Sequence, residues 1–201
     1  MMLALIDIES GNLHSVANAL RAAGCDDLVV TADPDAVRRA DRIVLPGVGA
    51  FGACAANLRR VDGLEDALGA AALVRARPFL GICVGMQLLA ETGEEHGEHR
   101  GLGWLPGRVR RLAPADAGAR VPHMGWNDVT PVADHPLLAP GEAYFLHSYA
   151  WDGEGIAATT DHAGPVTAAV ARDTVLGVQF HPEKSQRYGI ELLKRFLQWR
   201  P

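Results

Sequence analysis

The chain has 201 residues, 48% of them apolar, which is enough for one compact domain that buries roughly 70% of its unfolded surface. The 19 Lys and Arg residues against 24 Asp and Glu residues give a net charge of −5, which excludes a polybasic nucleic-acid binder and a disordered acidic segment. No basic signal region opens the sequence and no uncharged apolar run reaches the ~18 residues that span a bilayer, so we expect one cytoplasmic domain over residues 1–201, with no membrane segment.

The first half of the chain alternates apolar strands with helical stretches. We expect strands over residues 3–8, 28–30 and 42–47, and helices over residues 15–23, 34–39 and 64–75. A strand over residues 78–83 then enters a turn at Cys83, and a helix over residues 86–92 leaves that turn. This alternation predicts a parallel sheet covered by helices on both faces.

The second half changes to short β-rich segments separated by Pro and Gly. Residues 93–103 are polar and predict a loop, and residues 188–199 predict a final amphipathic helix. Strands are expected over residues 108–112, 127–131, 143–150, 156–161, 166–172 and 174–180. The predicted fold is therefore α/β: a single flavodoxin-like domain with a mostly parallel central sheet, extended by antiparallel strands, and helices on both faces.

The three cysteines, Cys25, Cys54 and Cys83, include no CxxC pair, which argues against a disulfide framework and a structural zinc site. His96 and His99 have a metal-like spacing, but they lie in a polar segment without further candidate ligands nearby. We therefore expect neither a metal nor a cofactor.

One of these cysteines lies in the segment Gly-Ile-Cys-Val-Gly at residues 81–85, between a strand and a helix. This is the pattern of a nucleophile elbow, with Cys83 where esterases carry serine. Glycines on both sides permit a tight turn, and the start of the following helix favours a thiolate. On these five residues alone, a buried structural cysteine is an equally good interpretation.

A candidate base lies far along the chain, in the segment His181-Pro182-Glu183 at the end of a strand. Pro182 favours an extended backbone at His181, and residues two apart in an extended segment project to the same side. Glu183 can then orient the imidazole of His181 so that its other nitrogen faces a thiol. Without Cys83, a surface histidine beside a solvated glutamate would be the simpler interpretation.

Residues 47–52 match the pattern GxGxxG, which suggests dinucleotide binding. The match is weak, because the segment follows the third strand and no acidic residue ends a strand at the expected spacing. A better hypothesis is that the backbone of residues 46–49 supplies one N–H group to an oxyanion and Val84 supplies a second. A glycine-rich structural turn is the alternative for Gly52.

The segments GICVGMQ, PGVGAF and HPE together resemble the class I, triad-type glutamine amidotransferases over nearly the whole chain. Within that family, the segments SGNLHSV, PGVGAFG, PHMGWN, YFLHSY and HPEKS are similar to glutaminase subunits of imidazole glycerol phosphate synthase, of the histidine pathway. The resemblance implies that glutamine is hydrolysed to glutamate and ammonia. Ammonia would pass through a channel to a (βα)8-barrel cyclase subunit, in a heterodimer that makes imidazole glycerol phosphate and an aminoimidazole carboxamide ribotide.

The resemblance also implies roles for individual residues. Cys83 would be the nucleophile, His181 the base and then the acid, and Glu183 the orienting carboxylate, with the amides of Val48 and Val84 as the oxyanion hole. The implied glutamine pocket consists of Gly49, Gln87, Glu95, Ser148 and Tyr149. The implied cyclase interface and ammonia passage involve Asn12, Trp126, Tyr144 and Lys184.

The chain departs from the family pattern at Ile8 and Glu9, which stand in place of an aromatic residue and a glycine, and at Gln186, where a small residue is more usual.

The alternative functions are a glutaminase subunit of another synthase, such as one making anthranilate or pyridoxal phosphate, and a non-catalytic flavodoxin-like binding subunit. A cysteine peptidase or esterase on the same scaffold is a third.

Overall fold

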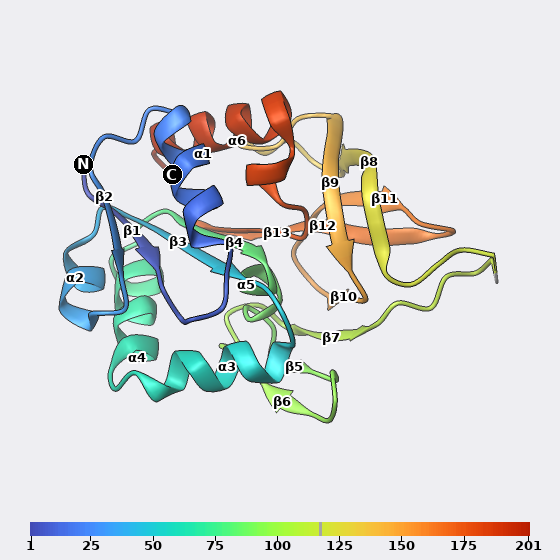
Figure 1. Ribbon diagram of the computed structural model, residues 1–201, viewed down its shortest axis with the longest axis horizontal. Helices are drawn as coiled ribbons and strands as arrows, with labels where there is room; N and C mark the ends of the chain where they lie inside the picture. The colour runs from blue at the N-terminus through green and yellow to red at the C-terminus, as the bar shows by residue number, and fades with distance from the viewer. Residues whose placement is uncertain (117) are drawn as a thin grey trace.

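A mixed sheet of nine strands runs through the centre of the fold in the computed structural model, which describes residues 1–116 and 118–201 (Figure 1). One half is parallel, in the order β2-β1-β3-β4-β13. Its strands are β1 (Leu3–Ile6), β2 (Leu28–Thr31), β3 (Arg42–Gly47), β4 (Phe79–Cys83) and β13 (Val175–Val178). Strands β1, β3, β4 and β13 are fully buried, as expected for a parallel sheet covered on both faces.

The other half of this sheet is antiparallel and continues from β13 in the order β12-β11-β8-β9. These strands are β12 (Pro165–Arg172), β11 (Ile156–Asp161), β8 (His123–Pro131) and β9 (Gly141–His147). The predicted antiparallel extension of a parallel sheet is thus confirmed.

A smaller four-stranded sheet, in the order β10-β7-β5-β6, was not predicted. It consists of β5 (Thr92–Gly93), β6 (His99–Arg100), β7 (Gly107–Arg111) and β10 (Tyr149–Gly153). The single strand expected over residues 143–150 is therefore wrong: it divides at Ser148 into β9 and β10, which belong to different sheets. The expected loop over residues 93–103 likewise contains β6.

Helices cover both faces of the parallel half, with α1 and α6 on one side and α2, α3 and α4 on the other (Figure 1). Their bounds are α1 (Leu13–Ala22), α2 (Pro34–Arg39), α3 (Phe51–Arg60), α4 (Leu64–Gly69) and α6 (Gln186–Gln198). Helix α4 runs on into a π-helical turn over Ala70–Val74, so the predicted helix over residues 64–75 is confirmed. Among the described residues, no helix is long and apolar enough to cross a membrane.

Two helix predictions need correction. Helix α3 was not expected, although Phe51, Cys54, Ala55 and Leu58 form its buried face with helical spacing. The helix expected over residues 86–92 is instead α5 (Val84–Gln87), a single turn. It stops because the carbonyl oxygens that would continue it, among them that of Leu88, accept hydrogen bonds from the incoming backbone near residue 102.

The C-terminal helix is tied to the start of β3 by Arg42, whose side chain is buried. Its Nε donates to the carbonyl of Leu197 at 3.0 Å and its Nη2 donates to the carbonyl of Trp199 at 2.6 Å. These carbonyls at the end of α6 have no partner within the helix, so a guanidinium is well suited to them.

We therefore predict that Arg42→Met lowers the free energy of unfolding by about 2–4 kcal/mol, because two charge-assisted hydrogen bonds are lost. Urea denaturation followed by circular dichroism measures the change. The control is Arg38→Met, which removes an exposed ion pair with Asp35 and should change stability by less than about 0.5 kcal/mol. Equal effects of the two substitutions would contradict this role of Arg42.

Candidate active site

Cys83 is the last residue of β4 and has φ 55° and ψ −112°, a conformation that L-residues rarely adopt. The strained turn directs its side chain out of the sheet, as in a nucleophile elbow. The flanking glycines are required sterically: a Cβ on Gly85 would collide with the carbonyl oxygen of Leu45, and a Cβ on Gly81 would lie 2.5 Å from the carbonyl oxygen of Gly85. The predicted elbow at Cys83 is present.

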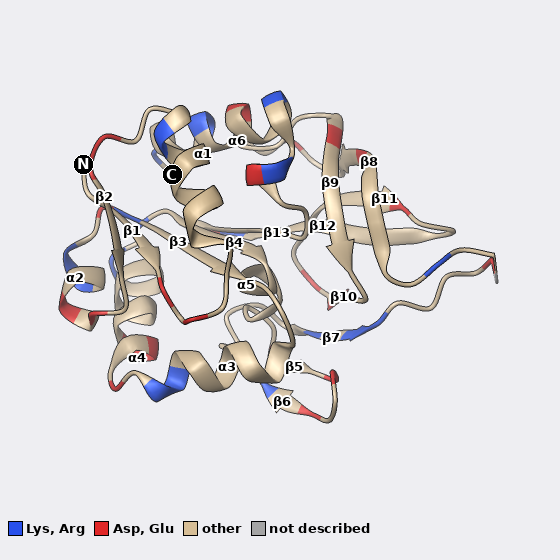
Figure 2. Cartoon of the chain, in the orientation of Figure 1, with Lys and Arg blue, Asp and Glu red and all other residues tan. Residues whose placement is uncertain are grey.

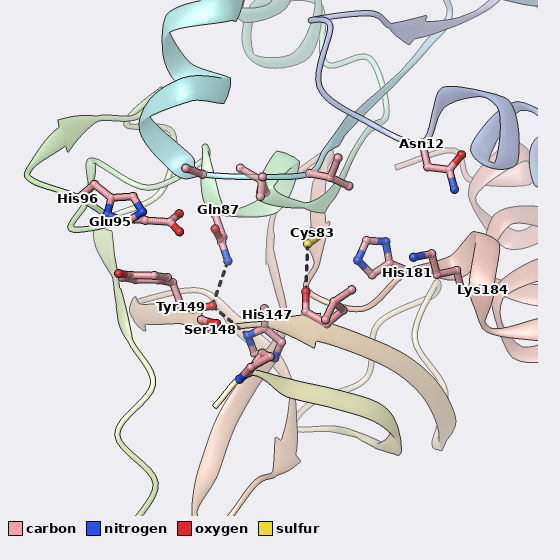
Figure 3. Close-up of a pocket in the computed structure, with 16 residues that line it drawn as sticks. Asn12, Cys83, Gln87, Glu95, His96, His147, Ser148, Tyr149, His181 and Lys184 are labelled. Carbon is pink, nitrogen blue, oxygen red and sulfur yellow. Dashed lines mark hydrogen bonds between the residues drawn. The ribbon is translucent and has the colours of Figure 1, made fainter. Parts of the chain in front are cut away.

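His181 and Glu183 follow β13, the strand that pairs with β4, so they lie at the same sheet edge as Cys83. Their side chains are 3% and 2% exposed, and Nδ1 of His181 lies 2.8 Å from Oε1 of Glu183. The carboxylate can only accept, so Nδ1 carries a hydrogen and Nε2 is left to face the thiol of Cys83 (Figure 3).

Burial opposes a charge on His181, but hydrogen bonding and charge from Cys83 and Glu183 outweigh burial and raise the pKa of its imidazole to about 9. Such an imidazole holds its proton at neutral pH. It is therefore equipped to stabilise a thiolate and to protonate a leaving group.

A cavity of about 700 Å³ opens in front of these groups (Figure 3). The predicted site residues that line it are Asn12, Val48, Gly49, Cys83, Val84, Gln87, Glu95, Ser148, Tyr149, His181 and Lys184. Glu183 lies behind His181 and does not line the cavity. Trp126 and Tyr144, which were expected at a partner interface, also lie outside it.

The predicted glutamine-pocket residues come from four segments of the chain. Gln87 donates from Nε2 to the carbonyl oxygen of Tyr149 at 3.0 Å, which ties α5 to the junction of β9 and β10. Glu95 accepts from the backbone N–H of Phe51 at 2.9 Å, at the start of α3, which has no other side-chain cap. Hydrogen bonds between residues far apart in the sequence therefore bring the predicted pocket residues together.

Val48 directly follows β3 and Val84 begins α5 directly after β4, and the last residues of the two strands, Gly47 and Cys83, are paired in the register. The carbonyl oxygen of Val48 accepts hydrogen bonds from Oγ of Ser10 and from Sγ of Cys54. Gly49, next along the chain, has φ +97°, a conformation that favours glycine. The segment that matched GxGxxG is thus a turn at the cavity wall.

Of the four predicted interface residues, Asn12 and Lys184 line the cavity, and Tyr144 lies between Lys184 and Trp126. Trp126 of β8 and Tyr144 of β9 are directly opposite in the strand register, and their ring centroids are 6.3 Å apart. Nζ of Lys184 lies 5.7 Å from the centre of the Tyr144 ring. Asn12 caps α1, because its Oδ1 accepts from the N–H of Ser15.

The structure shows the backbone conformation and contacts of the residues that depart from the family pattern. Glu9 and Gln186 both have positive φ, 55° and 45°, where glycine would be free of strain. The carboxylate of Glu9 pairs with Arg60 at 2.6 Å, while Ile8 is buried in the core.

His96 lines the cavity, whereas His99 packs beside Gly52. Within residues 1–116 and 118–201, no group of three or more His, Cys, Asp or Glu side chains is placed to hold a metal ion.

A buried histidine pair beside the cavity was not predicted. Nδ1 of His147 lies 2.9 Å from the carbonyl oxygen of Tyr149, and its Nε2 lies 3.0 Å from Nδ1 of His123. Burial lowers the pKa of His147 to about 3 and that of His123 to about 4, so both rings are neutral at pH 7. Because the Tyr149 carbonyl only accepts, His147 carries its hydrogen on Nδ1 and accepts from His123.

Gln179 was also missed in the sequence analysis. This residue is completely buried, and its Nε2 lies 3.7 Å from Sγ of Cys83. A signal was present. Gln179 is a polar residue in an apolar strand and precedes His181 by two residues, which places both side chains on the same side of an extended segment.

A family model described as "Glutamine amidotransferase class-I" matches residues 4–199. The chain therefore belongs to the class-I glutamine amidotransferase family. Two solved structures share the fold at low sequence identity: one titled "Crystal structure of glutamine amidotransferase" (TM-score 0.75, 20% identity, 98% of both chains), and "Structure of PurLQS from Thermotoga maritima" (TM-score 0.71, 19% identity, 98% of this chain and 95% of that one).

Curated relatives narrow the identification. The chain is 60% identical to "Imidazole glycerol phosphate synthase subunit HisH" of Zymomonas mobilis, over 98% of this chain and 96% of the relative. It is 52% identical to the subunit of the same name from Ruegeria pomeroyi, over the full length of both. Within the class-I family, the chain belongs to the HisH group.

The geometry of the triad predicts that the imidazole of His181 titrates near pH 9 in the wild type and that Glu183→Gln moves this midpoint down towards 6.5. A raised pKa stabilises the folded state fully below about pH 6.5, and this contribution, of order 3 kcal/mol, is lost as pH rises towards 9.

Nuclear magnetic resonance of the imidazole measures the titration, and urea denaturation across this pH range measures the loss of stability. The control is Glu191→Gln on the surface of α6, which pairs with Lys194 and should leave His181 unchanged. A wild-type midpoint near 6.5 would contradict the proposed coupling of His181 to its neighbours.

Proposed function

We propose that the chain is the glutaminase subunit of an imidazole glycerol phosphate synthase in histidine biosynthesis, and that it hydrolyses glutamine through Cys83, His181 and Glu183. The observation that carries this proposal is the placing of the strained Cys83 and the buried, carboxylate-paired His181 at one end of a 700 Å³ cavity. The kinship with HisH subunits supports the same conclusion.

The reaction follows from the properties of these groups. The thiolate of Cys83 attacks the side-chain amide carbon of glutamine, and the protonated His181 gives its proton to the departing ammonia. Water then adds to the γ-glutamyl thioester, with His181 as the base, and releases glutamate. Glu183 keeps the imidazole oriented and stabilises its charged form.

In this proposal the N–H groups of Val48 and Val84 bind the oxyanion formed on the amide oxygen. The cavity side chains of Gln87 and Glu95, with the backbone around Gly49, Ser148 and Tyr149, hold the glutamine. The hydrogen bonds that fix the Val48 carbonyl to Ser10 and Cys54 support this role, since they determine which way the neighbouring peptide groups can face.

We further propose that ammonia passes to a (βα)8-barrel cyclase subunit in a cytoplasmic heterodimer. An apolar surface beside the cavity supports this: Met124 is 64% exposed, Trp126 48% and Leu146 37%. These residues lie on the paired strands β8 and β9, which are mostly tan, the colour of residues other than Lys, Arg, Asp and Glu, in Figure 2. Asn12, Tyr144 and Lys184 border the same surface and would contact the cyclase or the ammonia passage.

The parallel strand order also fits the expectation of a flavodoxin-like domain. With β13 counted as the fifth strand, the order β2-β1-β3-β4-β13 is the flavodoxin-like order 2-1-3-4-5. We propose that residues 1–201 form one such domain, because buried residues from both ends of the chain belong to one core cluster.

Cys83→Ala should abolish synthesis driven by glutamine and leave synthesis driven by added ammonium salt largely intact, because the acceptor chemistry lies on the cyclase. The assay measures imidazole glycerol phosphate with each nitrogen source, on complexes shown to be assembled. Cys25→Ala removes a buried thiol that does not line the cavity and is the control. Equal loss of both activities in an assembled Cys83→Ala complex would contradict a simple nucleophile role.

We also expect the chain alone to be a slow glutaminase that the cyclase, loaded with its ribotide ligand, accelerates at least tenfold. Losing one oxyanion donor costs roughly 10²–10³ in kcat in proteases, so a misdirected Gly47–Val48 peptide would suffice to hold the site idle. Glutamate release should be measured for the chain alone, with the cyclase, and with cyclase plus ligand. Three similar rates would refute control by the partner.

A further inference from the structure

The side chain of Gln179 lies between Gln87 and Cys83 in a buried chain of hydrogen bonds that ends at the nucleophile. It is 0% exposed, lies just beyond the end of β13, and its backbone N–H donates to the carbonyl of Ala168 at 2.8 Å. Gln179 does not line the cavity, so it is not placed to touch a bound substrate. An amide buried this deeply is costly unless its polar atoms have partners.

The neighbouring groups fix which way the amide of Gln179 faces. The carbonyl oxygen of Tyr149 can only accept a hydrogen bond, so the atom of Gln87 that lies 3.0 Å from it is the nitrogen. The same nitrogen lies 3.0 Å from Gln179, and the atom that it meets there must be the acceptor Oε1. The amide nitrogen of Gln179 is then directed at Sγ of Cys83, at 3.7 Å.

We propose that Gln179 is a further catalytic residue, which donates a side-chain N–H to Sγ of Cys83 and stabilises the thiolate. This inference rests on the proposed function only in so far as Cys83 is the nucleophile. The thiolate forms twice in the cycle, before attack on glutamine and again when the thioester breaks.

In the second step, water adds to the thioester carbonyl and gives its proton to His181. The C–S bond then breaks, and its electron pair returns to sulfur. A donor placed at sulfur therefore favours both the free nucleophile and the departing thiolate, and protonated His181 stabilises the same negative charge. The residues that line the cavity, and not Gln179, would contact the carbon and oxygen atoms of the substrate.

The test is the pH dependence of alkylation of Cys83 by iodoacetamide, followed by mass spectrometry of the peptide that contains Cys83. This readout separates Cys83 from Cys25 and Cys54 and needs no glutamine turnover. Gln179→Met keeps the length and volume of the side chain but removes the donor. We expect it to move the alkylation midpoint up by about one pH unit, the shift that a hydrogen bond to a charged group can produce.

Two further variants make the result specific. Gln179→Glu keeps the shape but places a carboxylate beside sulfur, and it should raise the midpoint at least as far as Gln179→Met. Thr167→Val is the matched control: it removes another buried hydrogen bond, from Thr167 to the carbonyl of Trp151, on strand β12 and outside the cavity. It should leave the midpoint unchanged.

If folded Gln179→Met has the same alkylation midpoint as the wild type, the proposal is overturned. If that variant does not fold, an unchanged or lowered midpoint in Gln179→Glu overturns it instead. Glutaminase assays of the complex separate this inference from the proposed function. A raised midpoint in Gln179→Met, together with a wild-type complex that does not hydrolyse glutamine, would refute only the function. A wild-type complex that hydrolyses glutamine, together with an unchanged midpoint in Gln179→Met, would refute only the role of Gln179.

Discussion

The backbone of the turn after β4 packs directly on the neighbouring strand β3, with no side chain between them. Gly81 and Gly85 make this approach possible, since a Cβ on Gly85 would overlap the carbonyl of Leu45. The approach holds Cys83 at φ 55°, which places its sulfur above the sheet edge. The other parts of the site lie at this same edge, because β3 and β13 flank β4 and run parallel to it.

Around this turn, burial and the hydrogen-bond acceptors beside each histidine determine where the ring carries its hydrogen and whether it is charged. Glu183 holds the hydrogen of His181 on Nδ1, and the Tyr149 carbonyl holds that of His147 on Nδ1. The consequences are opposite: the pKa of His181 is raised to about 9, while burial lowers that of His147 to about 3. Of these two histidines, His181 is therefore the one suited to proton transfer at neutral pH.

The sequence predicted the parts of this account that are local in the chain. The elbow needs two glycines within five residues, and the His181–Glu183 pair needs only an extended segment, so each was visible as a short pattern. The alternation of strands and helices likewise indicated the parallel sheet. Carrying family motifs onto this chain identified residues that the cavity brings together, such as Gln87 and Glu95.

What was missed depends on contacts between distant segments. Helix α5 ends early because backbone N–H groups near residue 102 donate to the carbonyl oxygens that would continue the helix. The expected strand over residues 143–150 divides because β10 pairs with β7. Gln179 was missed because its meaning comes from Gln87 and Cys83, both about ninety residues away along the chain. No short pattern carries that information.

The central claim is that glutamine is cleaved through a covalent intermediate on Cys83. The most direct measurement is rapid acid quenching of the assembled complex during turnover of glutamine, followed by peptide mass spectrometry. The account predicts a γ-glutamyl thioester on the peptide that contains Cys83 and on neither of the peptides with Cys25 and Cys54. Steady glutamate release with no adduct on Cys83, or with the adduct on another residue, would contradict it.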